Sequence, residues 1–182
     1  MMDRELKRED MRAVKDYKGR TIISIRKGKK LGMLDDVLID PDPIQVAALV
    51  TSSGWLPWRD LKAIPADEVR VWGEDAILVE TPDVIKKQKE LPETRTWLSM
   101  SDEIIGRDVI STDGDKVGEI SDALMDAEGE LVGFRLSQIG YALDEVLAEG
   151  PGPKADWISS DAVHSMGTDV LVIDTERIKV ES

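Results

Sequence analysis

Cysteine is absent from this sequence, and so is any long hydrophobic run. Without cysteine the chain has no disulfide framework, no thiolate metal site and no thiol nucleophile. No stretch approaches the roughly 18 consecutive apolar residues of a membrane-spanning helix. The charge-rich residues 1–18 do not resemble a signal peptide. We therefore expect a soluble, cytoplasmic protein.

Histidine is nearly absent too, since it occurs only as His164. A Ser-His-Asp triad would have to use this residue, yet the G-x-S-x-G elbow that presents such a serine is missing. The patterns H-E-x-x-H, G-x-x-x-x-G-K-S/T and G-x-G-x-x-G are missing as well. Residues 113–115 lack the further ligands of a calcium loop and are typical of a hairpin turn. We predict that the protein is not an enzyme, has no cofactor or metal site, and carries His164 on its surface.

Positive charge is scarce in the second half of the chain. Residues 1–92 carry 17 Lys and Arg and 17 Asp and Glu, whereas residues 93–182 carry 7 and 20, so the net charge of −13 lies entirely in the second half. Phosphate backbones are bound by clustered Lys and Arg. This asymmetry therefore makes nucleic acid an unlikely partner for the second half, and it concerns partners rather than fold.

An internal repeat organises the chain. Lys30–Asp40 recurs as Lys116–Asp126, and the hydrophobic stretches that follow, Val46–Val50 and Val132–Leu136, are offset by the same 86 residues. The closing segments around Gly73 and Gly167 are offset by 94 residues, so the second copy holds 8 extra residues, within 138–156. The sequence therefore predicts two small domains rather than one large one.

Short β-branched runs bounded by turn residues predict strands in both copies. We predict an N-terminal helix or arm at 1–17, a first repeat at 18–82, a helical linker at 83–103, a second repeat at 104–176 and a tail at 177–182. The linker is expected to be helical because Asp83 lies in its first turn and Pro92 ends it.

Strand alternation predicts which side chains face the core. The inward residues are expected to be Val46, Ala48 and Val50 in the first copy and Val132, Phe134 and Leu136 in the second, with Arg135 facing outward. The strand at 34–39 carries apolar residues on both faces. We expect its surplus face to be covered by the other repeat or by a second subunit in a homodimer.

The repeated pattern resembles the PRC-barrel family. Its residues here are Gly19 and Gly106, Gly32 and Gly118, Asp40 and Asp126, Asp67 and Asp161, and Gly73 and Gly167. The family includes the cytoplasmic domain of the photosynthetic reaction-centre H subunit and the C-terminal domain of a ribosome maturation factor. The resemblance implies an all-β fold of two tandem, highly bent barrels, used for binding and assembly without catalytic residues.

Two features present in only one copy are candidate binding residues. Four cations, Arg26, Lys27, Lys29 and Lys30, lie on a predicted hairpin turn whose counterpart at 112–116 is acidic. A charged hairpin turn usually serves solubility alone. As a binding site it suits an acidic protein, lipid headgroups or RNA. Trp55 and Trp58 form a pair that is either an interface anchor or part of a barrel core. The competing site is the insert at 138–156.

These observations favour a non-enzymatic adaptor that binds a protein partner in a larger assembly. Some archaeal members of the PRC-barrel family suggest a membrane-associated or cell-division assembly, with peripheral rather than integral attachment to a membrane. The alternative is an RNA-processing or ribosome-assembly factor, by analogy with the maturation factor. The net charge of −13 opposes that alternative.

Overall fold

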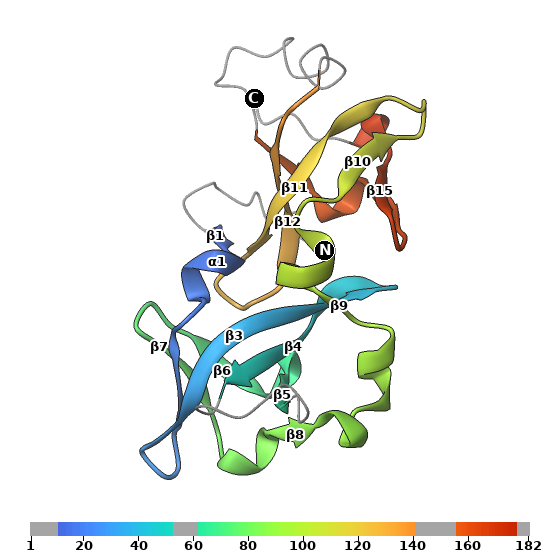
Figure 1. Ribbon diagram of the computed structural model, residues 1–182. Coiled ribbons are helices and arrows are strands. Elements are labelled where there is room, and N and C mark those ends of the chain that lie inside the picture. The colour runs from blue at the N-terminus through green and yellow to red at the C-terminus, as the bar shows by residue number, and fades with distance from the viewer. Residues whose placement is uncertain (1–10, 53–61, 141–155, 178–182) are drawn as a thin grey trace, which may run out of the picture.

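The computed structural model describes residues 11–52, 62–140 and 156–177, and within them the chain is almost entirely β-structure. Two small, strongly bent barrels lie one above the other, and each is built by one copy of the repeat (Figure 1). The predicted all-β fold with tandem barrels is confirmed. Trp55, Trp58 and most of the 138–156 insert lie outside the described residues.

Each repeat supplies six strands in the same order. The first contains β2 (Thr21–Ser24), β3 (Lys29–Pro41), β4 (Ile44–Ser52), β5 (Lys62–Pro65), β6 (Val69–Trp72) and β7 (Ala76–Val79), with the 3-10 turn η2 (Ala66–Glu68) before β6. The second contains β10 (Asp108–Ser111), β11 (Lys116–Met125), β12 (Leu131–Ser137), β13 (Trp157–Ser159), β14 (Val163–Met166) and β15 (Val170–Ile173), with the 3-10 turns η7 (Ser160–Ala162) and η8 (Thr175–Arg177).

The two sheets share one topology. Neighbouring strands follow the order β6-β7-β2-β3-β4-β5 in the first repeat and β14-β15-β10-β11-β12-β13 in the second. The first and last strands of each repeat, β2 with β7 and β10 with β15, pair in parallel. This pairing returns the end of each repeat to its beginning and curls the sheet into a barrel.

The segment that precedes each repeat pairs with the other barrel. We call these segments arms: the first contains β1 (Arg12–Ala13) and α1 (Val14–Tyr17), and the second contains β9 (Leu98–Ser99) and the one-turn π-helix η6 (Met100–Ile104). The first arm pairs with β11, with Ala13 opposite Leu124. The second arm pairs with β3, with Ser99 opposite Leu38. These two pairings use equivalent residues, so the barrels exchange arms about a pseudo-two-fold axis.

One aspartate in each barrel receives the incoming arm. Asp122 of β11 accepts a hydrogen bond from the backbone N–H of Lys15, at 3.3 Å. Asp36 of β3, its equivalent, accepts hydrogen bonds from the backbone N–H of Ser101, at 3.2 Å, and from the hydroxyls of Ser99 and Ser101. The carboxylates therefore satisfy backbone donors at the start of each arm's helical turn.

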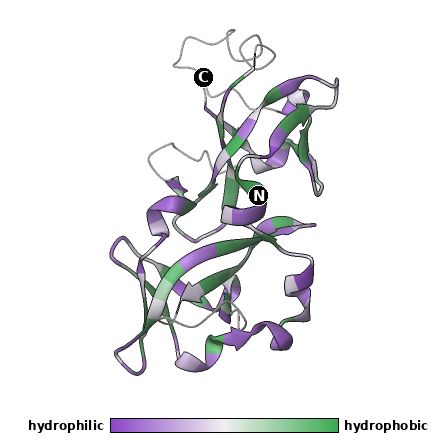
Figure 2. Cartoon of the chain, in the orientation of Figure 1, coloured by the Kyte–Doolittle hydropathy of each residue, from purple (hydrophilic) through white to green (hydrophobic). Residues whose placement is uncertain are grey.

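The main hydrophobic core extends through both barrels without interruption. It includes Ile22, Ile39 and Ile77 of the first repeat, and Phe134 and Leu171 of the second. Green, hydrophobic segments accordingly follow the strands of both barrels as well as the middle of the molecule (Figure 2). The predicted repeats are thus two barrels that share one core.

The predicted inward faces are only partly correct, because β-bulges shift the alternation. In β4 the pairing skips Ala47, so Val46 and Leu49 enter the main core while Ala48 and Val50 lie on the outer face. In β12 it skips Val132, which packs on the outer face against Ala13 and Leu124. Each bulge adds one residue and reverses the alternation beyond it.

The remaining predictions for β12 are correct. Phe134 and Leu136 belong to the main core. Arg135 lies opposite Asp122 on the other face, and its guanidinium Nε is 3.7 Å from a carboxylate oxygen of Asp156.

The outer face of the first barrel is covered by the linker between the repeats. Leu38, Ala48 and Ala63 form a small cluster there, under Leu91 and Trp97. The linker therefore occupies part of the face that we expected the other repeat or a second subunit to cover.

The linker also differs from the predicted helix. It consists of the 3-10 turns η3 (Pro82–Val84), η4 (Gln88–Glu90) and η5 (Pro92–Arg95), with β8 (Lys86–Lys87) pairing to β5. That strand pairing and the two prolines divide the segment into single turns.

Candidate interaction surfaces

The turn between β2 and β3 carries the four cations singled out in the sequence: Arg26, Lys27, Lys29 and Lys30, which we call the basic tip. Gly28 occupies the turn with φ +55°, a left-handed conformation that favours glycine. All four cations are exposed. Arg26 forms an ion pair with Glu80, at 2.9 Å, whereas the three lysines form none within the described part of the chain. Their charges are therefore available to a partner.

The equivalent turn of the second barrel is acidic. It lies between β10 and β11 and exposes Asp113 and Asp115, whose backbone N–H groups donate to the hydroxyl of Ser111 at 3.3 and 3.1 Å. It is the hairpin turn that the sequence predicts. The basic and acidic tips lie at opposite ends of the molecule (Figure 1). The difference in charge between the two repeats thus places positive and negative turns at opposite ends of the molecule.

Trp55 and Trp58 are not placed, because residues 53–61 lie outside the described part of the chain. The point where that segment leaves the sheet is known. Ser52, the last residue of β4, pairs with Met33 of β3, which is three residues after Lys30. The strand β4 therefore ends on the side of the barrel that carries the basic tip.

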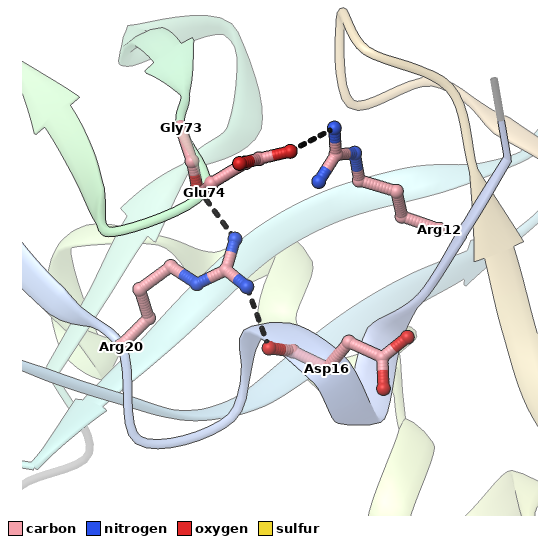
Figure 3. A network of polar contacts seen from close by, with 5 residues as sticks. All are labelled: Arg12, Asp16, Arg20, Gly73 and Glu74. Atoms are coloured by element: carbon pink, nitrogen blue, oxygen red, sulfur yellow. Dashed lines mark hydrogen bonds and ion pairs between the residues drawn. The ribbon is translucent and has the colours of Figure 1, made fainter. Parts of the chain in front are cut away.

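In each barrel one arginine donates a hydrogen bond to the loop between the last two strands, β6–β7 in the first barrel and β14–β15 in the second. The guanidinium of Arg20 donates to the carbonyl of Gly73 at 2.5 Å and to that of Asp16 at 2.8 Å (Figure 3). In the second barrel Arg107 donates to the carbonyls of Gly167 and Glu103. Sequence analysis did not identify these arginines, although the repeated Gly-Arg pair was a visible signal.

One further contact in this network joins the first arm to the first barrel. Arg12 pairs with β11 of the second barrel through its backbone, while its guanidinium forms an ion pair with Glu74 of the first, at 3.0 Å (Figure 3). The Glu74 side chain is 75% exposed and that of Arg12 is 39% exposed, so the ion pair is in contact with water and adds little stability on its own.

One end of the interface between the barrels is filled by Trp72 of β6. Its ring meets Tyr17 edge to face, with centroids 5.4 Å apart. The opposite wall is Gly129, in the turn between β11 and β12 (φ +84°), where a Cβ would overlap the indole. Trp72 is only 7% exposed. This end is therefore closed by an aromatic side chain that bridges the two barrels.

The other end of the same interface is open. A groove of about 560 Å³ lies between the turn after β3 and the strand β14. Its lining includes Pro41, Asp42 and Ile44 of the first barrel and Asp161, His164 and Met166 of the second. Met166 is the repeat equivalent of Trp72. Sequence analysis missed this groove, and the signal that could have revealed it was this difference between the copies.

The described residues offer little for catalysis. No group of three or more metal-ligating side chains occurs among them. His164 is exposed, as predicted from the sequence. Asp122 is the more buried of the two buried carboxylates in the described part of the chain, the other being Asp126, and burial raises the pKa of Asp122 above the ordinary value of 3.8 despite the hydrogen bonds from Ala123 and Lys15. It serves to hold the first arm.

The family of this chain follows from comparison with known proteins. Across the three described ranges, no helix has the length and apolar character needed to cross a membrane. A search among curated proteins found no match. The profile of the PRC-barrel domain matches residues 9–85 and again residues 100–180. PRC-barrel domains are generally protein-interaction modules without catalytic activity. The chain therefore belongs to the PRC-barrel family and carries two copies of its domain.

Proposed function

We propose that this chain is a non-enzymatic adaptor that binds an acidic protein partner at the basic tip of its first barrel. The partner would belong to a larger assembly, such as membrane-associated or cell-division machinery. Trp55 and Trp58 are the proposed anchors beside the tip, because β4, the strand that precedes them in the sequence, ends opposite Met33 near the start of β3.

The observation that carries the proposal is the contrast between two equivalent turns. Both are hairpin turns with a glycine at positive φ, so folding alone does not require either charge. The first turn exposes four cations, whereas the second exposes two carboxylates and one cation, Lys116, which forms ion pairs with Asp108 and Glu119. Charges that differ at equivalent exposed positions point to a purpose other than the fold.

The placement of the two tips also gives the complex an orientation. An acidic partner is attracted to the basic tip and repelled by the acidic tip at the far end of the molecule (Figure 1). Charges of this kind mainly accelerate association and favour one docking orientation. Binding at the tip should therefore weaken steeply as salt concentration rises.

The test is a charge reversal with a matched control. Lys27, Lys29 and Lys30 are changed together to Glu, and the control changes three exposed linker residues, Lys87, Lys89 and Arg95, to Glu. Both variants alter the net charge by the same amount. Immobilised proteins are incubated with native lysate, and captured proteins are identified by mass spectrometry at low and physiological salt.

We expect the tip variant to lose about ten-fold or more of the acidic proteins that wild type captures, and the linker variant to retain them. Thermal stability should change little in the tip variant, because exposed turn charges contribute little to folding. Equal capture by both variants contradicts the proposal. Retention of RNA by wild type at physiological salt, lost in the tip variant, would instead favour the RNA-processing alternative.

A further inference from the structure

The two ends of the interface between the barrels occupy equivalent positions in the repeats but carry different residues. Trp72 ends β6 and Met166 ends β14. Opposite Trp72 lies the turn that contains Gly129, and opposite Met166 lies the equivalent turn, which contains Asp42. The large indole closes the first end. The smaller Met166 side chain does not fill the second end, and the groove remains there.

The groove has an apolar floor and an acidic rim. Met166 belongs to the main core and is only 8% exposed, and the half-buried Ile44 and Val163 add apolar surface beside it. Asp42 and Asp161 are exposed on opposite sides, one from each barrel, and neither is paired with a cation in the described part of the chain. The lining contains no lysine and no arginine. The groove therefore favours a cationic ligand.

We propose that this groove binds a partner protein through an aromatic side chain, tryptophan above all, that is flanked by Lys or Arg. The aromatic ring lies against Met166 and Ile44, as the Trp72 ring lies between the barrels at the equivalent end. The flanking cations pair with Asp42 and Asp161. Sulfur and aromatic rings attract one another, which adds to the burial of apolar surface.

The shape of the groove favours an extended polypeptide segment. All four residues of β14 line it, and among the described strands β14 pairs only with β15. An edge strand offers unpaired backbone groups to an added strand. Rim residues on both barrels allow cations on either side of the ring to be held at once. This site is separate from the basic tip and has the opposite charge preference.

The test uses the full-length protein and three blocked pentapeptides: Gly-Lys-Trp-Lys-Gly, Gly-Lys-Ala-Lys-Gly and Gly-Glu-Trp-Glu-Gly. Binding is followed by two-dimensional ¹H–¹⁵N NMR through the backbone amides of Ile44, Ser165 and Met166. The indole N–H of Trp72 at the closed end is an internal control. We expect the Lys-Trp-Lys peptide to bind about ten-fold more tightly than either other peptide, and the Trp72 signal to stay in place.

Substitutions separate the contributions of the ring and the charges. Met166→Trp places an indole where Trp72 has one at the other end and should abolish binding of the Lys-Trp-Lys peptide. Met166→Leu keeps the apolar floor and should preserve binding within about three-fold. Asp42→Asn combined with Asp161→Asn should remove the preference for Lys over Glu, and this double variant changes only exposed residues.

Three outcomes overturn the proposal. These are equal affinity for the three peptides, shifts that spread over the surface without centring on the groove, and unchanged binding by a folded Met166→Trp protein. Self-association of wild type that disappears in Met166→Trp would assign the groove to a second copy of this chain and would also overturn it. Because the basic-tip variant leaves the groove intact, it should bind the Lys-Trp-Lys peptide like wild type, so the two proposals can fail independently.

Discussion

Asp122 is a buried carboxylate at the junction of the first arm and the second barrel. It is 1% exposed and accepts backbone hydrogen bonds from Ala123, at 2.8 Å, and from Lys15, at 3.3 Å. Burial disfavours the charged form, and this effect outweighs the hydrogen bonds and the nearby cations, so the pKa of Asp122 is raised above 3.8. The carboxylate joins arm and barrel, but its charge opposes folding.

This raised pKa predicts a pH-dependent stability. Between the unfolded pKa, near 3.8, and the higher folded pKa, the folded state binds more protons, so rising pH lowers the free energy of unfolding contributed by Asp122. Asp122→Asn removes this titration. Urea unfolding at a series of pH values should show wild type losing stability relative to the variant as pH rises above about 4.

The control for that experiment is Asp115→Asn, which removes one exposed carboxylate from the acidic tip. A stability difference between wild type and Asp122→Asn that stays constant over this pH range, or that changes in favour of wild type, would contradict the assignment.

At the scale of elements, the two exchanged arms are short but well buried. Ala13 is 2% exposed and packs with Leu124 and Val132 on the outer face of the second barrel. The arm adds a strand to a sheet that would otherwise present an edge there. We therefore expect the first arm to stabilise the second barrel more than the barrel that follows it in sequence.

Ala13→Asp tests this contact. A charge placed between Leu124 and Val132 has no cation among its described neighbours in that cluster, so the free energy of unfolding should fall by about 2 kcal/mol or more. The control is Ala127→Asp, since Ala127 is exposed in a turn and should tolerate the change within about 0.5 kcal/mol. Chemical denaturation measures the free energy of unfolding of both variants. Equal losses would contradict a stabilising contact between the first arm and the second barrel at Ala13.

The elements show which parts of the fold were accessible from sequence. The repeat and the hairpin turns around Gly28 and Gly114 are visible in the sequence, and these predictions were correct. The bulges at Ala47 and Val132 have none, because either residue could continue a regular strand. The inward faces of β4 and β12 were therefore predicted incorrectly in part. Arm exchange is a long-range pairing of two-residue strands, too short for any periodicity to reveal.

The candidate sites divide in the same way. Four adjacent cations are visible in a sequence, and the structure places Arg26, Lys27, Lys29 and Lys30 on one exposed turn. The groove is assembled from residues more than a hundred positions apart, such as Asp42 and Met166. Only knowledge of how the barrels face each other brings such residues together.

For the whole molecule, the shared core predicts a single cooperative unfolding transition. The main core includes residues of both repeats, and the arm before each repeat pairs with the barrel that the other repeat forms. Loss of either barrel therefore exposes apolar surface on its neighbour. Urea unfolding followed by far-UV circular dichroism and by tryptophan fluorescence should give coincident midpoints. Two separated midpoints would show that the barrels unfold independently.

The pseudo-two-fold arrangement of the two repeats also affects how the two ends of the interface between the barrels can change in sequence. In a dimer of identical chains, the two ends of a two-fold interface carry the same residues, so one substitution alters both ends at once. Here the two halves are separate stretches of one chain, and each position can change alone. Trp72 closes one end while Met166 leaves the other open. Covalent joining thus allows one end to remain the structural contact while the other is free to acquire a ligand.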